Sequence, residues 1–391
     1  MNFGVVCEFN PFHAGHAYIF DKARELGSDN IVCAMSGNAV QRGELAMLDK
    51  YKRSEVAALR GADLVLELPY PYSSASAEYF AMAGIRILAP FCDALIFGSE
   101  CGDIELLRLA AELSLSDGFL TEFDAKKRGG EGAASAYFSL IEEKLGVKLS
   151  SNDILGVEYI KAAKKLGVRL DFFTVKRLGN AYRNDNLEDG NIPSASAIRR
   201  AVNEENIDAL LRIDPQLANM IKGLEKSGEI IDVQLLERAC LACFRLAEPC
   251  EISAYAECDG GVAERICLAA KESSDLDEFW NAVKTKRYTN AKLRRAMLFA
   301  LTRVDRELLM RAPEYTFLLA ANERGRELLS VNKKVYSGTG NGVKIITKPA
   351  DAPRDTRQFA VEERLNSLFM LAQKKAFPTG EAYRKNAFII K

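Results

Sequence analysis

The first 200 residues alternate short runs of aliphatic and β-branched residues with longer stretches whose apolar residues recur every three or four positions. This alternation predicts strands of a parallel sheet joined by helices. Several strand-like runs are apolar almost throughout, as expected when helices cover both faces of the sheet. We predict strands at 3–7, 30–35, 63–68, 94–97 and 170–175, and helices at 16–26, 47–60, 75–88, 104–115, 134–145 and 154–166.

The second half of the chain has a mainly helical pattern, with no internal repeat and no heptad run. A loop rich in Gly and Asn, at 179–191, separates the two halves. We therefore predict an α/β fold: a doubly wound, Rossmann-like parallel-sheet domain over 1–200, followed by a mainly α-helical domain over 201–391. Within the second domain we predict helices at 233–246, 262–274, 291–301 and 357–373, and a small Gly-rich and strand segment near 337–347.

The composition is that of an ordinary globular protein, with 48% hydrophobic and 27% charged residues. No apolar run reaches the roughly 18 residues that cross a bilayer, and the N-terminus lacks the features of a signal peptide. We expect a cytoplasmic protein without a membrane partner. Because the formal net charge is only -1, any polyanionic partner must be bound by a local basic patch.

Nine cysteines are scattered at irregular spacing, which predicts reduced thiols rather than a disulfide framework. Cys240 and Cys243 alone have the spacing of a pair of zinc ligands. They lie inside an apolar helical pattern and far in sequence from the histidines. We expect buried helix cysteines there, with zinc as the alternative, and predict no metal site formed by the protein.

Both histidines of the chain, His13 and His16, fall at the junction of the first strand and the first helix. A buried structural histidine is the alternative, but free N–H groups and the dipole at a helix N-terminus favour phosphate. Two imidazoles beside a triphosphate can donate hydrogen bonds to oxygens that gain charge when the bond between the α- and β-phosphates breaks. Gly15 lacks a β-carbon, so a base or ribose could lie close to the backbone. This turn predicts ATP-dependent nucleotidyl transfer.

A second candidate site lies at the start of a predicted helix, where Ser194 and Ser196 precede Arg199. Simple N-capping by the serines is the alternative interpretation. Small hydroxyl residues, exposed N–H groups and an arginine at one helix start also suit a phosphate. Together with the histidine pair, we assign these three residues a catalytic role.

A basic segment near residue 290 is the best candidate for binding RNA, since it carries six basic residues and no acidic one. Lysine and arginine neutralise backbone phosphates, and a tyrosine offers a stacking surface for a base. A solvated helix start is the alternative interpretation. The predicted RNA-binding residues are Lys284, Lys286, Arg287, Tyr288, Lys292, Arg294 and Arg295.

These motifs resemble the HxGH nucleotidylyltransferase superfamily and, within it, the bacterial tRNA(Met) cytidine acetate ligase family. The resemblance covers the first 200 residues densely and the helical remainder in outline only. It is carried by the segments 8–16, 35–38, 41–44, 62–69, 97–100, 151–156 and 176–177.

The resemblance implies an enzyme that activates acetate with ATP as acetyl-adenylate and then acetylates the wobble cytidine of elongator tRNA(Met). ATP would be a substrate, together with Mg²⁺. Residues 1–200 would bind ATP and 201–391 would bind the tRNA. The implied ATP-binding residues are Val6, Cys7, Glu8, Phe9, Asn10, Pro11, Phe12, His13, Ala14, Gly15, His16, Ala17, Tyr18, Ile19, Gly98, Asn152 and Arg177.

Two residues depart from the family pattern, which commonly has Tyr and Asn where this chain has Phe9 and Ala14. One hydroxyl and one amide contact are therefore absent. Glu8 and Asn10 could equally contact substrate or hydrogen-bond their own loop. Two other functions stay open: a cytidylyl- or adenylyltransferase acting on a small phosphorylated metabolite, and a non-catalytic RNA-binding protein that keeps the fold.

Overall fold

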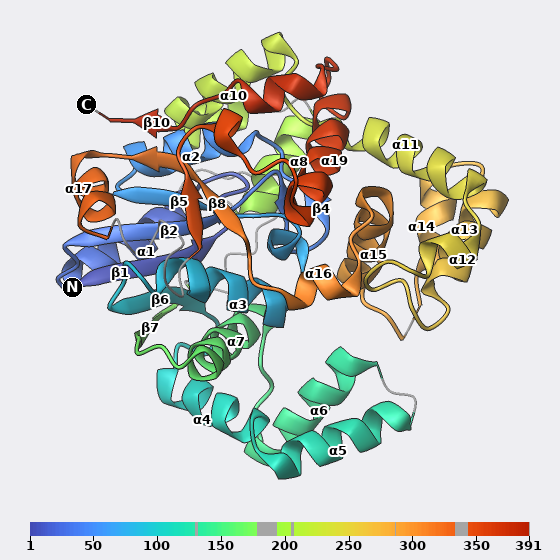
Figure 1. The fold of residues 1–391 in the computed structure, drawn as a ribbon, viewed down its shortest axis with the longest axis horizontal. Coiled ribbons are helices and arrows are strands. Elements are labelled where there is room, and N and C mark those ends of the chain that lie inside the picture. Colours follow the sequence, from blue (N-terminus) through green and yellow to red (C-terminus); the bar gives the residue numbers. More distant parts are fainter. Residues whose placement is uncertain (130–131, 178–193, 205–206, 286, 333–342, 391) are drawn as a thin grey trace.

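The computed structural model describes residues 1–129, 132–177, 194–204, 207–285, 287–332 and 343–390. Its centre is a mainly parallel sheet in the order β10-β8-β5-β2-β1-β6-β7, with β9 paired to β8 (Figure 1). All five strands predicted in the first half are confirmed. The strands of this sheet are β1 (Asn2–Cys7), β2 (Asn30–Ser36), β5 (Leu64–Leu68), β6 (Ala94–Ser99), β7 (Asp171–Lys176), β8 (Tyr315–Ala321), β9 (Lys344–Ile346) and β10 (Phe388–Ile389).

The direction of winding reverses between β1 and β6. From β1 the chain winds outward through β2 and β5, whereas β6 and β7 lie on the other side. In doubly wound sheets, ligands bind beyond the carboxyl ends of the strands at such a reversal. The residues that follow Cys7 and Ser99 therefore lie where a ligand-binding site is expected.

Helices cover both faces of the sheet because alternate strand residues point to opposite sides. In β2, Ile31, Cys33 and Met35 pack toward α1 and α2, whereas Val32 and Ala34 pack toward α3. The predicted helices of the first half are confirmed, and α5, with only Phe119 buried, was not predicted. These helices are α1 (Ala14–Glu25), α2 (Lys50–Leu59), α3 (Ala77–Leu88), α4 (Ile104–Ser114), α5 (Asp117–Arg128), α6 (Ala133–Leu145) and α7 (Ser151–Leu166).

Strand β8, from the second half of the chain, extends the sheet of the first half. It runs antiparallel to β5, and all seven of its residues are buried. Thr316 Oγ1 donates a hydrogen bond 2.5 Å long to the carbonyl of Glu67. The sheet is therefore not wholly parallel, and a division of the chain at residue 200 does not coincide with its limits.

Buried polar and charged side chains lie where the C-terminal helix α19 (Arg357–Leu371) packs against the same sheet. Lys50 Nζ lies 2.6 Å from Glu67 Oε2, and both side chains are almost fully buried. Tyr315 donates to Glu362 of α19. Burial and the neighbouring Glu67 raise the pKa of Glu362 to about 8, so this carboxyl is mostly protonated at neutral pH.

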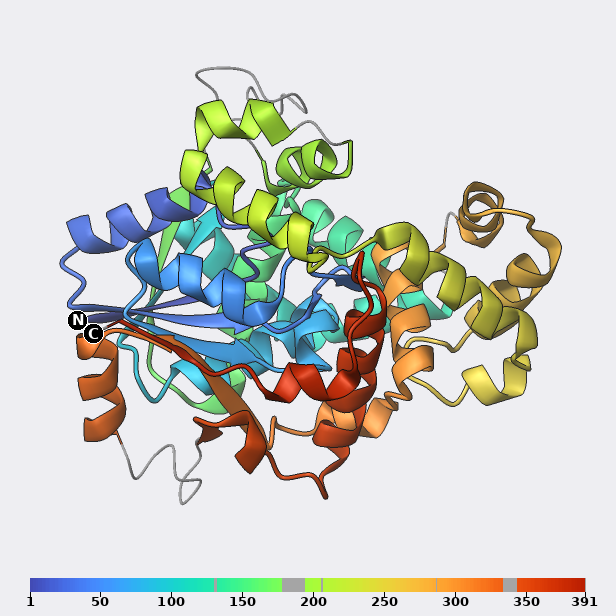
Figure 2. The same ribbon diagram turned by 90° about the horizontal axis from the view of Figure 1, so that it is seen from above.

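The residues between α8 and α16 form the helical region, and in Figure 2 its yellow and orange helices extend to one side of the sheet. The four predicted helices are confirmed as α11, α13, α15 and α19, and β9 confirms the predicted strand. The loop 179–191 and residues 337–342 lie outside the described residues. The helices beyond residue 194 are α8 (Ala195–Asn203), α9 (Ile207–Ile213), α10 (Pro215–Ser227), α11 (Val233–Leu246), α12 (Pro249–Ile252), α13 (Val262–Glu272), α14 (Leu276–Val283), α15 (Asn290–Thr302), α16 (Arg306–Met310), α17 (Glu323–Val331) and α19.

A short hairpin after β2 joins the sheet to the helical region. Its strands are β3 (Ala39–Val40) and β4 (Glu44–Leu45). Gly43 has φ +77°, and a β-carbon on it would lie 2.5 Å from the backbone nitrogen of Arg295 in α15. Only glycine permits this close approach. Within the described part of the chain, no helix is long and apolar enough to cross a membrane.

Candidate active site

The two histidines lie in the turn between β1 and α1, where His13 is the N-cap of the helix. The backbone N–H of Gly15 donates to His13 Nδ1 at 3.0 Å, and that of His13 donates to His16 Nδ1 at 3.2 Å. The two rings stack with their centroids 3.9 Å apart. The pair is therefore held in place by its own backbone, as a capping box made of histidines.

This arrangement fixes which nitrogen of each ring carries the proton. A neutral imidazole that accepts at Nδ1 carries its hydrogen on Nε2. Burial and the positive charge of Arg177 lower the pKa of His13 to about 4. Burial, His13 and Arg177 lower the pKa of His16 well below its ordinary value. At neutral pH both rings are thus uncharged donors through Nε2–H.

Gly15 lies directly against the ring of the first histidine. A β-carbon at this position would lie 2.8 Å from His13 Cε1 and 3.0 Å from His13 Nδ1. The direction in which a β-carbon would point is therefore filled by the His13 ring. Glycine is needed here because any side chain would displace the first histidine from its cap.

Aromatic residues support the second histidine from behind. The rings of Phe9 and Phe12 have their centroids 4.9 Å and 5.5 Å from that of His16, and both phenylalanines are buried. Phe9, where the family commonly has Tyr, has φ +45° and packs in this cluster. Ala14, the other departure, is exposed at the first position of α1.

The remaining members of the predicted ATP segment differ in how far they reach the surface. Cys7 is buried, and Pro11 follows a cis peptide bond. Val6 and the α1 residues Ala17, Tyr18 and Ile19 are half-buried. The segment is therefore partly core and partly surface.

The loop after β6 is fastened to the N-terminus of α7 by Asp153. Its Oδ1 accepts from the Ser99 hydroxyl at 2.6 Å and from the backbone N–H of Glu100 at 2.9 Å. Its Oδ2 accepts from the backbone N–H of Ser150 at 2.9 Å. These bonds hold the carboxyl end of β6 against a helix N-terminus, where anions are stabilised.

Glu100 connects the two residues predicted to bind ATP in this region. Asn152 Nδ2 donates to Glu100 Oε1 at 2.6 Å, and Arg177 Nε lies 3.9 Å from the same oxygen. A β-carbon on Gly98 would lie 3.3 Å from Arg177 Cγ and 3.8 Å from Ile19 Cδ1. The fold thus brings the histidines, Gly98, Asn152 and Arg177 to one edge of the sheet. Sequence reasoning gave no role to Glu100, whose partners lie about 50 to 80 residues away.

The serine-rich helix start contacts protein groups. Ser194 Oγ accepts from the backbone N–H of Ala197 at 3.1 Å, which is the capping alternative. Arg199 Nη1 donates to the carbonyl of Asn10 at 2.7 Å, and its Nη2 lies 3.4 Å from Ser196 Oγ. Arg199 therefore supports the turn that carries the histidines.

Glu8 and Asn10 hydrogen-bond their own surroundings. Glu8 Oε1 accepts from the backbone N–H of Gln41 at 2.9 Å. Asn10 Oδ1 accepts from the backbone N–H of Met47 at 2.8 Å. Each side chain therefore joins the histidine turn to the segment around the β3–β4 hairpin.

Two arginines of the predicted RNA-binding segment form ion pairs within the protein. Arg294 forms an ion pair with Glu44 of the hairpin. Arg295 forms a bidentate ion pair with Glu257, with Arg295 Nε 2.9 Å from Glu257 Oε1. Reversing their charge would therefore disturb the packing of α15 as well as any contact with RNA.

The other basic residues of this segment are less engaged. Lys284 and Arg287 are exposed, Lys292 lies 4.6 Å above the Tyr288 ring, and the Tyr288 hydroxyl donates to the carbonyl of Gly260. Lys286 lies outside the described residues. The exposed members are the better candidates for phosphate contacts.

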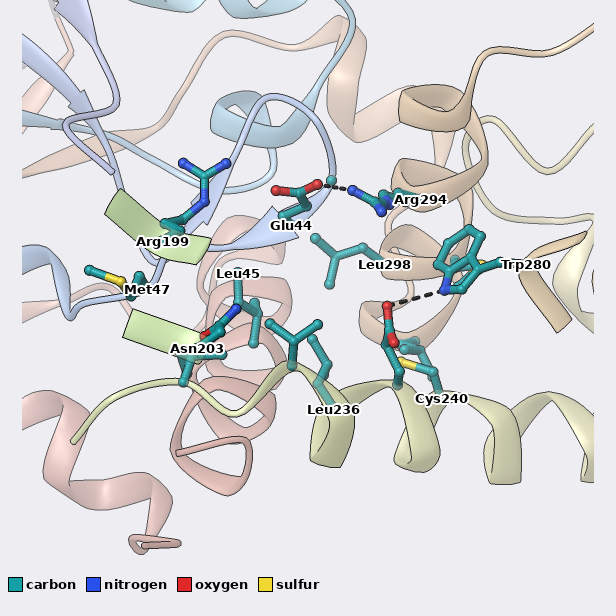
Figure 3. A pocket seen from close by; sticks show the side chains of 16 residues that line it. Glu44, Leu45, Met47, Arg199, Asn203, Leu236, Cys240, Trp280, Arg294 and Leu298 are labelled. Atoms are coloured by element: carbon teal, nitrogen blue, oxygen red, sulfur yellow. Dashed lines mark hydrogen bonds and ion pairs between the residues drawn. The ribbon is translucent and has the colours of Figure 1, made fainter. Parts of the chain in front are cut away.

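A pocket of about 240 Å³ lies between the hairpin, α8, α11, α14 and α15 (Figure 3). Most of its wall is apolar, with polar side chains at its edges. The lining residues are Gly43, Glu44, Leu45, Met47, Arg199, Asn203, Ile231, Val233, Leu236, Glu237, Cys240, Trp280, Arg294, Met297, Leu298 and Leu301.

Comparison with known proteins agrees with this arrangement. The family model described as HIGH Nucleotidyl Transferase matches residues 1–382. The tRNA(Met) cytidine acetate ligase of Clostridium perfringens is 32% identical over 378 residues, covering 90% of this chain and 91% of the relative. This chain belongs to the tRNA(Met) cytidine acetate ligase family. The family member from Caldanaerobacter subterraneus is 33% identical over 390 residues, with 95% of each chain covered.

The family resemblance extends over the whole structure. The crystal structure of Thermotoga maritima TmcAL bound with alpha-thio ATP matches with a TM-score of 0.87 at 28% identity, covering 100% of both chains. The apo form of the same protein gives a TM-score of 0.89. The cytidine acetate ligase fold therefore includes β8 and the helical region as well as the nucleotide-binding half.

Proposed function

We propose that this chain activates acetate with ATP and transfers the acetyl group to the wobble cytidine of elongator tRNA(Met). The observation that carries the proposal is the stacked histidine pair, whose Nε2–H donors lie near Arg177 at the edge where the winding of the sheet reverses. A family whose members are cytidine acetate ligases supplies the reaction.

In the first step a carboxylate oxygen of acetate attacks the α-phosphorus of ATP. The bond between the α- and β-phosphates breaks, and pyrophosphate leaves with the negative charge. Neutral imidazoles donate hydrogen bonds to oxygens that gain charge in this step, without exchanging a proton. Arg177 adds a fixed positive charge, and Asn152 fits a contact to ribose or base.

In the second step the exocyclic N4 amine of cytidine attacks the acyl carbon of acetyl-adenylate. The N4–carbon bond forms, the bond between the acyl carbon and the phosphate oxygen breaks, AMP leaves, and the proton lost from N4 passes to solvent water. The adenylate is itself the leaving group, so no cysteine or lysine has to carry the acetyl group.

Magnesium would arrive with the triphosphate. Among the residues described, no group of three or more His, Cys, Asp or Glu side chains could hold a metal ion. Mg²⁺ commonly binds phosphate oxygens and keeps several waters, so it does not need a cage of carboxylates. It would share the neutralisation of the phosphates with Arg177.

The test is to incubate the protein with ATP, acetate and bulk tRNA and to analyse the nucleosides by mass. We expect acetylcytidine in elongator tRNA(Met), and exchange of pyrophosphate into ATP that depends on acetate. If exchange of pyrophosphate into ATP requires a phosphorylated metabolite instead of acetate, the protein is a nucleotidyltransferase that acts on small molecules. RNA binding without ATP consumption would establish a non-catalytic protein.

A further inference from the structure

We propose that the pocket between the β3–β4 hairpin and α11, α14 and α15 receives the cytosine base of the RNA substrate, with Glu44 and Arg294 reading its Watson–Crick edge. The proposal rests on the proposed function and assigns its second substrate a place in the molecule.

The size and walls of the pocket suit a single base. Pockets for drug-sized ligands usually measure about 300–1,000 Å³, so a volume of about 240 Å³ fits a smaller planar group. Figure 3 shows Leu45, Leu236 and Leu298 gathered along the wall. Proteins read single-stranded RNA by taking unstacked bases into such apolar surroundings and hydrogen-bonding their edges.

Glu44 and Arg294 form the polar edge of the pocket, as the dashed line in Figure 3 marks. Their side chains are 30% and 38% exposed, so a ligand can reach both. Cytosine presents an amine donor at N4 beside acceptors at N3 and O2. A carboxylate accepts from N4 and a guanidinium donates to the acceptors, which makes the pair complementary to cytosine.

Uracil reverses two of these contacts, because its N3 also carries a hydrogen and becomes a donor. It has a carbonyl oxygen where cytosine has the N4 amine, and this oxygen would face the Glu44 carboxylate without a hydrogen between them. The pair therefore discriminates between the two pyrimidines. This discrimination matters because only the base with the amine can be acetylated.

The arginine is held in place by the residues behind it. Its guanidinium lies 5.2 Å from the Trp280 ring centroid, and the Trp280 Nε1–H donates to Glu237 Oε1 at 3.1 Å. These two contacts, from Arg294 to Trp280 and from Trp280 to Glu237, fix the plane of the guanidinium before any ligand arrives. Such preorganisation increases both affinity and selectivity.

The pocket is also linked to the histidine turn. Arg199 and Met47, both lining residues, hold the carbonyl and the side chain of Asn10, three residues before His13. The exposed Lys284 and Arg287 lie in the segment that joins α14 and α15, both of which contribute to the wall. A base in the pocket would thus lie between the adenylate-forming turn and the basic segment.

The experiment compares binding of the full-length protein to two tRNA(Met) transcripts that differ only in a wobble cytidine or uridine. We expect wild-type protein to bind the cytidine form about 10-fold more tightly, within the range of one good base contact. Glu44→Gln should bring this ratio well below about 10, because an amide can donate to the uracil oxygen as well as accept from cytosine.

The matched control is Glu257→Gln. Glu257 pairs with Arg295, which follows Arg294 in α15, and neither Glu257 nor Arg295 lines the pocket. It should keep the 10-fold ratio. A ratio of 1 in the wild type, an unchanged ratio in Glu44→Gln, or equal losses in both variants would overturn the proposal.

A second pair of variants tests the space itself. Leu236→Trp should fill the pocket and weaken binding of the cytidine transcript about 10-fold, whereas Leu235→Trp on the exposed neighbour should not. Equal binding by both variants would contradict the proposal. Acetate-dependent exchange by the wild type is measured separately, so that its absence refutes the proposed function and not the base preference.

Discussion

The histidine turn and the basic segment at 284–295 are both short, and each carries an evident chemical signature, yet only the contacts of the first are mainly local. His13 and His16 are held by backbone groups within three residues of themselves. Arg294 is held by Glu44, 250 residues away. The histidine geometry can therefore be inferred largely from neighbouring residues, whereas the contacts of the basic segment depend on residues far away in the sequence.

The largest expected effect tests the turn. His16→Ala should slow acetate-dependent pyrophosphate exchange by about 100-fold or more, the usual effect of removing one preorganised donor to a developing charge. His13→Asn should also slow exchange while keeping a good N-cap, so its thermal unfolding should change little. A loss of exchange that merely follows a loss of stability would show that the histidines are structural.

The second prediction concerns pH. In the unfolded chain His13 takes up a proton near its ordinary pKa of 6.5, but in the folded chain only near pH 4. The unfolded state therefore binds more protons in this window, and stability falls as the pH drops from about 6.5 to about 4. The effect is at most about 3 kcal/mol. Denaturant unfolding should show a smaller loss over this range in His13→Asn, and an equal loss would contradict the shift.

The third prediction tests the loop that faces the turn. Arg177→Ala should weaken ATP binding about 10-fold to 100-fold, the range for one charge-assisted contact. Asn152→Ala should weaken it less. Neither should change tRNA affinity. Nucleotide and tRNA binding measured by calorimetry would decide this, and equal effects on both ligands would assign the residues a structural role.

The smallest expected effect concerns the basic segment. Reversing the exposed Lys284 and Arg287 should weaken tRNA binding about 10-fold at physiological salt and flatten its salt dependence by about 0.7 to 0.9 in log–log slope for each lost contact. Exchange of pyrophosphate, which needs no RNA, serves as the control for folding. Unchanged affinity and slope would place the RNA surface elsewhere.

Much of the nucleotide-binding half was predictable because its signals are local. The strands around Val32 and Leu66 are apolar runs of strand length, and His13 precedes a helical pattern, so each could be assigned from its neighbours. The start of α1 at Ala14, two residues before the predicted start, was missed because its N-cap is His13 rather than Ser or Asp.

The rest depended on contacts between distant residues. The run from Tyr315 to Ala321 is as apolar as β5, but nothing in its sequence states that it joins the sheet of the first half. Glu100 gained a role only when the fold placed Asn152 and Arg177 beside it. The ion pair of Arg295 with Glu257, 38 residues away, could not be inferred from the neighbours of Arg295 in the sequence.

The position of β8 and α19 has a consequence for how the protein is made. The edge of β5 stays open, and Lys50 and Glu67 lack part of their buried surroundings, until residues beyond 315 have been synthesised. A ribosome that has translated only the first 200 residues therefore carries an incomplete catalytic sheet with an exposed strand edge, which invites mispairing. We expect the enzyme to become competent only after β8 and α19 have been synthesised, so chains truncated before them would be unable to consume ATP.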